Sequence, residues 1–105
     1  MKLSDFANIH IVTPETSVRP TDILLQRVGV DDTVGKPFLG NDPATPRNTI
    51  IVSLNETGSC LVHPQYLYYM LTALHSQGYF SRLARGTAQQ FIKVSDVKDV
   101  PISLG

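Results

Sequence analysis

Residues 64–78, PQYLYYMLTALHSQG, carry the clearest secondary-structure signal in the chain. Pro64 suits the first turn of a helix, and Gly78 suits the position just after its C-terminal end. Four apolar side chains between them recur at helical spacing and form one stripe: Leu67, Met70, Leu71 and Leu74. The stretch therefore predicts a helix over about 64–77 that packs one face against a core.

A second, shorter apolar face follows directly, in Tyr79, Phe80, Leu83 and Ala84, and we expect Gly86 to end it. The two faces predict a bent helix or a helix pair. Three tyrosines spread around the first helix, so at most one or two of them can be fully buried: Tyr66, Tyr68 and Tyr69. We interpret them as the edge of the core, although aromatic rims also occur at partner surfaces.

Strand patterns dominate the chain before this helix. The stretch 48–54, NTIIVSL, is the richest in β-branched residues and predicts a strand. The apolar segments 22–30 and 33–39 flank a turn at Asp31-Asp32 and predict a hairpin, whereas 40–47, with two prolines, predicts a loop. A short strand is expected at residues 9–12, and Cys60 is expected to be buried at the start of a short apolar piece, 60–62.

The chain returns to a strand pattern at residues 91–94. Ser95-Asp96 suits the start of a single helical turn, and residues 100–104 predict a short closing strand. Six apolar side chains of this part are expected in the core: Phe91, Ile92, Val94, Val97, Val100 and Ile102. The predicted fold is α+β, with mostly antiparallel strands first and helices late, in a single small domain covering residues 1–105.

Composition excludes several classes of protein. Apolar residues make up 42% of the 105, and nine basic side chains balance nine acidic ones, so total charge indicates neither nucleic acid nor membrane as a partner. Residues 61–105 are mildly positive, with four Lys or Arg against two Asp. One cysteine cannot form an intramolecular disulfide, and the first residues show no continuous apolar signal segment, so we expect a cytoplasmic protein.

The residues that usually carry catalysis are sparse. His10, His63 and His75 lie far apart, without the spacing that places two imidazoles on one metal. Cys60 precedes His63 by three residues, but closeness in sequence does not indicate a nucleophile and its base. No phosphate-binding loop is present. We therefore expect a protein that is not an enzyme and has no metal or cofactor.

The order of these segments resembles a known family. A leading KLSDFANI (2–9), a strand TDILLQRVG (21–29), a helix HPQYLYYMLTAL (63–74) and a closing ARGTAQQFIKVSDVKDVPI (84–102) are similar to the target recognition domain of the type I restriction-modification specificity subunit. The resemblance covers nearly the whole chain. It implies an α+β domain that recognises one half of a bipartite DNA target in double-stranded DNA, while separate methyltransferase and restriction subunits act on the DNA.

Several side chains could serve such a role. Arg82 and Arg85 are three residues apart and are expected to share a helical face, beside Thr87, Gln89 and Lys93. Arginine and glutamine commonly pair with base edges, and lysine and threonine more often meet phosphate. The full set of predicted DNA-binding residues is Arg82, Arg85, Thr87, Gln89, Lys93, Arg27, Lys36 and Arg47.

Two other interpretations remain open. The basic residues can be a solvated face that complements the end of a helix, with residues 87–90 as a turn. Alternatively, a domain of this fold can act as an interaction protein, a regulator or decoy that forms a homodimer or binds methyltransferase or restriction subunits. The zero net charge and the absence of a long heptad segment motivate that second class.

Overall fold

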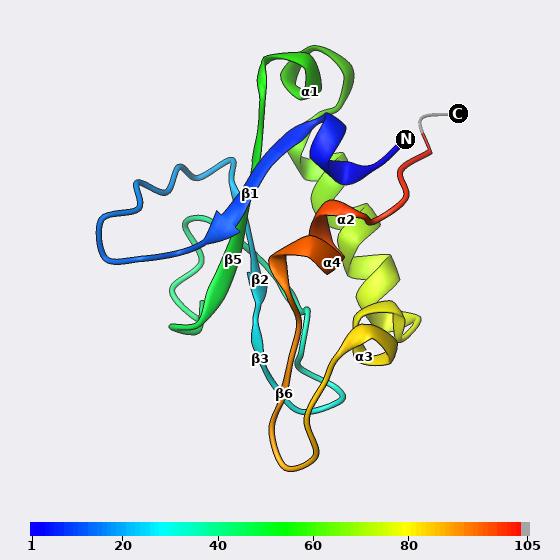
Figure 1. Cartoon of the computed structure of the whole chain (residues 1–105). Coiled ribbons are helices and arrows are strands. Elements are labelled where there is room, and N and C mark those ends of the chain that lie inside the picture. Colours follow the sequence, from blue (N-terminus) through cyan, green and yellow to red (C-terminus); the bar gives the residue numbers. More distant parts are fainter. Residues whose placement is uncertain (104–105) are drawn as a thin grey trace.

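The centre of the computed structural model, which describes residues 1–103, is a four-stranded antiparallel sheet (Figure 1). The strand order is β1-β5-β2-β4, and the bounds are β1 Ala7–Ile11, β2 Ile23–Gln26, β4 Pro37–Leu39 and β5 Thr49–Leu54. The β-branched stretch forms β5, which pairs with β1 on one side and with β2 on the other. The predicted hairpin is confirmed by the pairing of β2 with β4.

The hairpin also contains a branch that the sequence pattern did not indicate. After Gln26 the chain continues as β3 (Val28–Gly29), which leaves the main sheet and pairs antiparallel with β6 (Gln90–Phe91). We call this two-stranded unit the ribbon; it comprises residues 27–29 and 85–91 and includes the loop 86–89. In the view of Figure 1 the ribbon projects below the main sheet, at the end away from the two chain termini.

Four α-helices follow or interrupt the strands: α1 Glu56–Leu61, α2 Pro64–Ser76, α3 Tyr79–Leu83 and α4 Val94–Lys98. The predicted helix and the predicted helix pair are confirmed by α2 and α3, which meet at Gly78. A 3-10 turn, Leu3–Asp5, precedes β1. No helix in residues 1–103 combines the length and the apolar character needed to cross a membrane.

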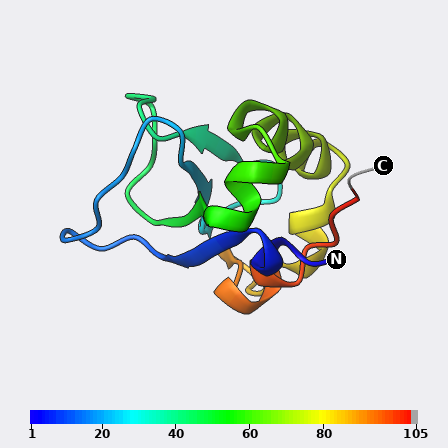
Figure 2. The same ribbon diagram turned by 90° about the horizontal axis from the view of Figure 1, so that it is seen from above.

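The main core lies between one face of the sheet and the helices, as Figure 2 shows from above. Leu67 and Leu71 of α2 and Phe80 of α3 are buried there. They share one cluster with side chains that alternate along the strands and therefore point to the same face: Ile9, Ile23, Leu25, Ile50 and Val52. The α+β fold class predicted from the sequence is confirmed.

The opposite face of the sheet carries a smaller apolar cluster. Leu24, Phe38 and Ile51 are buried there against the partly buried Val12 and Val18 of the long loop between β1 and β2. This loop lies on the side of the sheet away from α2 (Figure 2). The sheet is thus covered by helices on one face and by a loop on the other.

The prediction for Cys60 was wrong. Cys60 is exposed and lies in α1, not buried at the start of a strand. The reason is Asn55, whose Oδ1 accepts a hydrogen bond from the Gly58 N–H at 2.7 Å and caps a short helix that the sequence pattern did not indicate. Val62 just after the helix is buried, so only the last residue of the short apolar piece enters the core.

The segment after α3 also differs from its prediction. Helix α3 ends at Leu83, so Gly86 does not end a helix, and Arg85 lies outside the helix that carries Arg82. Arg85 instead exchanges both backbone hydrogen bonds with Phe91, at 3.0 and 2.9 Å. Arg82 and Arg85 therefore do not share a helical face.

The strand predicted at 91–94 is observed as β6, which begins one residue earlier and has only two residues. Helix α4 takes Val94, and its predicted turn is confirmed with Asp96 accepting a hydrogen bond from the Lys93 N–H at 3.2 Å. Of the residues expected in the core, Phe91 was predicted wrongly, because it is 38% exposed. Val94 is partly buried against the core, and the other four are buried: Ile92, Val97, Val100 and Ile102.

The closing strand is reduced to one bridge, between Pro101 and Lys2. Two backbone hydrogen bonds of 2.8 Å hold the tail beside the first residues, from the Leu3 N–H to the Val100 carbonyl and from the Ile102 N–H to the Met1 carbonyl. Leu104, the last residue of the predicted strand, lies outside the described residues. The tail therefore closes the core next to the N-terminal turn.

Candidate nucleic-acid interface

Backbone hydrogen bonds at the root of the ribbon bring together basic residues that are distant in the sequence. Arg27 lies between β2 and β3, and its N–H donates to the Asn48 carbonyl at 2.8 Å. Its own carbonyl accepts from the Ile92 N–H at 3.0 Å. The exposed Arg47 and Lys93 are the chain neighbours of Asn48 and Ile92. The backbones of Arg27, Arg47 and Lys93, three of the predicted DNA-binding residues, therefore lie close together at the root of the ribbon.

Three more of the predicted residues lie on the ribbon itself. Arg85 is opposite Phe91, and Thr87 and Gln89 lie in the loop 86–89; all three of these polar side chains are exposed. The arrangement offers a guanidinium, a hydroxyl and an amide on one projecting element (Figure 1). All three groups can donate hydrogen bonds to phosphates and to base edges, and the hydroxyl and the amide can also accept them from base edges.

Lys36 and Arg82 are directed elsewhere. The Nζ of Lys36 lies 5.5 Å from the ring centroid of Phe38, which belongs to the smaller apolar cluster of the main sheet. The Nη1 of Arg82 donates to the Gln77 carbonyl at the end of α2, at 2.9 Å. A cation there complements the negative end of the α2 dipole, so Arg82 has a structural partner.

Two polar atoms on the ribbon are buried without a hydrogen-bond partner among the described residues, Arg27 Nε and Gln90 Oε1. The ladder pairs Gly29 with Gln90, and Arg27 is bonded to Ile92, so both atoms belong to the face of the ribbon that turns toward the core. An unpaired buried polar atom costs about 1–3 kcal/mol. The ribbon therefore carries hydrogen-bonding capacity that its own chain does not use.

An acidic side chain limits where a polyanion can approach. A small cavity of about 110 Å³ at the tip of the ribbon is lined by Val30, Asp31, Thr87, Ala88 and Gln90. Asp31 is exposed there. Because its carboxylate repels phosphate, the favourable approach is along the side of the ribbon that carries Arg85 and Lys93.

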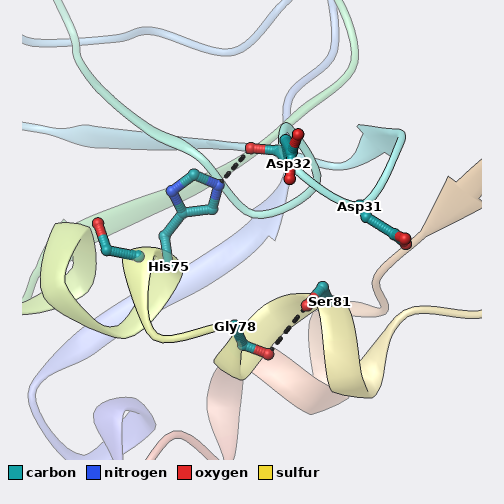
Figure 3. Close-up of a pocket in the computed structure, with 6 residues that line it drawn as sticks. Asp31, Asp32, His75, Gly78 and Ser81 are labelled. Carbon is teal, nitrogen blue, oxygen red and sulfur yellow. Dashed lines mark hydrogen bonds between the residues drawn. The ribbon is translucent and has the colours of Figure 1, made fainter.

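A larger cavity of about 350 Å³ lies between the β3–β4 loop and the helices, lined by Asp31, Asp32, His75, Ser76, Gly78 and Ser81. Figure 3 shows its two hydrogen bonds. His75 Nε2 lies 2.8 Å from the Asp32 carbonyl, so the ring nitrogen donates, and Ser81 Oγ donates to the Gly78 carbonyl at 3.0 Å. The first contact ties the β3–β4 loop to the end of α2. The second lies within the first turn of α3.

The other sequence candidates for chemistry have structural surroundings. His63 is the N-cap of α2, and its Nδ1 accepts a hydrogen bond from the Gln65 N–H at 3.2 Å. His10 is exposed on β1. Within residues 1–103, no group of three or more His, Cys, Asp or Glu side chains is placed to hold a metal ion.

The tyrosines of α2 divide into two kinds. Tyr68 packs against the main core, as expected for the edge of a core. Tyr66 and Tyr69 are more than half exposed, and the exposed Leu61 of α1 precedes them. The spacing of the tyrosines in the sequence did not show which of them is buried, because the apolar stripe of α2 already occupies the buried face of that helix.

One titratable group has a displaced pKa. Burial raises the pKa of the Tyr79 phenol, and the carboxylates of Asp96 and Asp99 on the α4 side add to the increase, while Arg82 opposes it. Tyr79 also packs edge-to-face on Phe80, with 5.3 Å between ring centroids. Tyr79 is thus partly buried, and it packs against the main core.

Comparison with known proteins supports the architecture. The crystal structure of the S subunit of a type I restriction-modification system from M. genitalium matches with a TM-score of 0.71 over 95% of this chain, at 16% sequence identity. The chain spans 32% of the length of that subunit. No family model matches the sequence, and no curated protein matches it. The likeness shows a shared fold, in agreement with the expectation from the sequence.

Proposed function

We propose that this chain is a DNA-sequence recognition module that binds half of a bipartite target in double-stranded DNA without catalysis. The observation that carries the proposal is the convergence of Arg27, Arg47 and Lys93 at the root of the ribbon, with Arg85 on the ribbon itself. The fold shared with an S subunit of a type I restriction-modification system supports the same assignment.

Electrostatics sets the expected strength of binding. The net charge is zero, so long-range attraction to DNA is weak, and binding depends on the local group of cations. Arg47, Arg85 and Lys93 are exposed, whereas Arg27 Nε is buried on the core-facing side of the ribbon. If the three exposed cations each neutralise about one phosphate, the affinity falls about 40-fold between about 50 and about 200 mM salt, with a logarithmic slope of about −2.7.

The test is fluorescence anisotropy with a pool of short random-sequence duplexes, titrated at several salt concentrations. Arg85→Gln and Lys93→Gln should each reduce the slope by about 0.9. Lys2→Gln is the matched control, because it removes the same charge from the far end of the molecule, where Lys2 forms an exposed ion pair with Asp99. Absence of binding at low salt, or equal slopes for all four proteins, contradicts the proposal.

A second function is favoured by a different surface. Leu61, Tyr66 and Tyr69 are more than half exposed on α1 and α2, and tyrosine is enriched at protein interfaces. That face suits an interaction protein that forms a homodimer or binds methyltransferase or restriction subunits. Light scattering of the wild type and of Tyr66→Ala, with capture of purified type I subunits, tests it. A monomer that captures neither subunit removes this alternative.

A further inference from the structure

The outer face of the ribbon carries an exposed aromatic side chain in a row of three paired residues. Phe91 is opposite Val28 in the β3–β6 ladder and opposite Arg85 in the adjoining bridge. Directly paired residues have side chains on the same face of a ribbon. The row therefore runs from Val28 through Phe91 to Arg85.

The burial of the neighbouring residue identifies which face this is. Ile92 is 1% exposed and belongs to the main core, whereas Phe91 is 38% exposed. Successive side chains along a strand point to opposite faces. Phe91 consequently points away from the core, and Val30, two residues beyond Val28 in the chain, is 55% exposed. The ribbon thus presents a small apolar surface.

The charges beside this surface indicate what covers it. Arg85 ends the row, and Lys93, two residues after Phe91, is also exposed. Asp31 lies by the cavity that Val30 and Thr87 line. An apolar group between cations complements a ligand that combines apolar contacts with phosphate. A DNA groove offers both, because thymine presents a methyl group in the major groove and phosphates border it.

We propose that Phe91 is a specificity-determining residue that contacts a thymine methyl group in the major groove, with Arg85 beside it on the phosphate or a base edge. The proposal rests on the proposed DNA-recognition function and deepens it. A two-stranded ribbon fits the width of the major groove, and phenylalanine makes apolar contact with the thymine methyl. The exposed loop 86–89 enters with the ribbon and brings Thr87 and Gln89 to neighbouring positions.

The experiment removes the methyl group from the DNA. Duplexes enriched by the wild type from a random pool are resynthesised with deoxyuridine in place of thymidine at one position at a time. Deoxyuridine keeps the hydrogen-bonding groups of thymidine and lacks only its methyl. At the contacted position, binding should weaken about fourfold for the wild type, the factor that corresponds to one buried methyl group.

Two variants assign the effect to Phe91. Phe91→Ala should bind the thymidine and deoxyuridine duplexes equally, whereas Phe91→Leu, which keeps an apolar group, should retain part of the discrimination. Tyr66→Ala, which removes another exposed aromatic ring on α2, should discriminate as the wild type does. Circular dichroism of each variant checks that the fold is kept.

The outcomes separate the two proposals. If no sequence is enriched from the pool at low salt, the recognition function itself is overturned. If sequences are enriched but no thymine is sensitive to loss of its methyl, or if Phe91→Ala keeps the sensitivity, the role of Phe91 is overturned and the recognition function stands. Should Phe91→Ala fail to fold, the wild-type comparison and Phe91→Leu still decide.

Discussion

The contact between Gly35 and Phe80 holds the β3–β4 loop, which closes the hairpin behind the ribbon, against α3. Gly35 has a φ of 81°, and its N–H donates to the Gln26 carbonyl at 2.7 Å. A Cβ at this position would overlap the Cβ and Cγ atoms of Phe80. Phe80 is fully buried and cannot move aside without disturbing the core. Gly35→Ala therefore tests whether this packing exists.

The magnitude follows from two separate costs. A left-handed backbone with a Cβ costs about 1–2 kcal/mol, and overpacking a core costs about 1–3 kcal/mol, so Gly35→Ala should lose about 2–5 kcal/mol of unfolding free energy. Gly78→Ala is the matched control. It has a φ of 79°, but its added Cβ lies 3.4 Å from the ends of two flexible side chains, Arg82 and Ser81. Only the backbone cost of about 1–2 kcal/mol applies there.

Urea unfolding followed by far-ultraviolet circular dichroism measures both variants. The account predicts that Gly35→Ala is less stable than Gly78→Ala by about 1–3 kcal/mol, because only the first meets the core. An equal loss in the two variants would refute the reasoning, since it would mean that the β3–β4 loop does not pack on Phe80. A loss larger in Gly78→Ala would refute it as well.

Substitutions at three other positions test parts of the same fold by urea unfolding. Asn55→Ala should lose about 1 kcal/mol by removing the N-cap of α1, and no change would contradict that cap. Asp22→Ala should lose about 1–3 kcal/mol and Asp22→Asn less, because the buried carboxylate accepts a hydrogen bond from the Arg19 N–H at 2.8 Å; equal losses would argue against that bond. Tyr79 has a raised pKa in the folded chain, so the unfolded chain releases the phenolic proton first and stability falls as the pH rises above about 10. The unfolding free energy of Tyr79→Phe should therefore decrease less at high pH than that of the wild type. The control Tyr66→Phe, at an exposed site, should follow the wild type. Identical pH curves for the wild type and Tyr79→Phe would contradict the assignment.

Local patterns were sufficient for the elements that carry most of the core. The stripe of α2 and the β-branched run of β5 each repeat one period over several residues, so these two elements could be predicted without knowledge of their tertiary contacts. The helix α1 was missed although Asn55 is a preferred N-cap residue, because its six residues, ETGSCL, have weak apolar periodicity. An N-cap residue that is not followed by an apolar helical stripe resembles the start of a turn.

Phe91 shows why strand faces are harder to predict than strands. Phe91, Ile92 and Val94 are all apolar, so the sequence does not fix the alternation, and a slip of one residue exchanges the two faces. The structure buries Ile92 and exposes Phe91 because the backbone bond from Ile92 to Arg27 fixes the register. That bond joins residues far apart in the chain.

The candidate site was predictable by residue type and not by position. Basic and amide side chains suited to DNA could be named from the sequence, but the convergence of Arg27, Arg47 and Lys93 depends on β3 leaving the main sheet to pair with β6. Each of those strands has two residues, too few for a period-2 pattern. The same pairing separates Arg85, on the ribbon, from Arg82, which caps α2.

A nuclear magnetic resonance titration of the isotope-labelled protein with a short duplex at low salt locates the DNA-binding surface residue by residue. We predict that amide shifts concentrate on residues 27–30, 47–48 and 85–93, and that raising the salt reverses them. Shifts centred on α1 and α2, around Leu61, Tyr66 and Tyr69, or no shifts at all, would contradict the ribbon as the DNA interface.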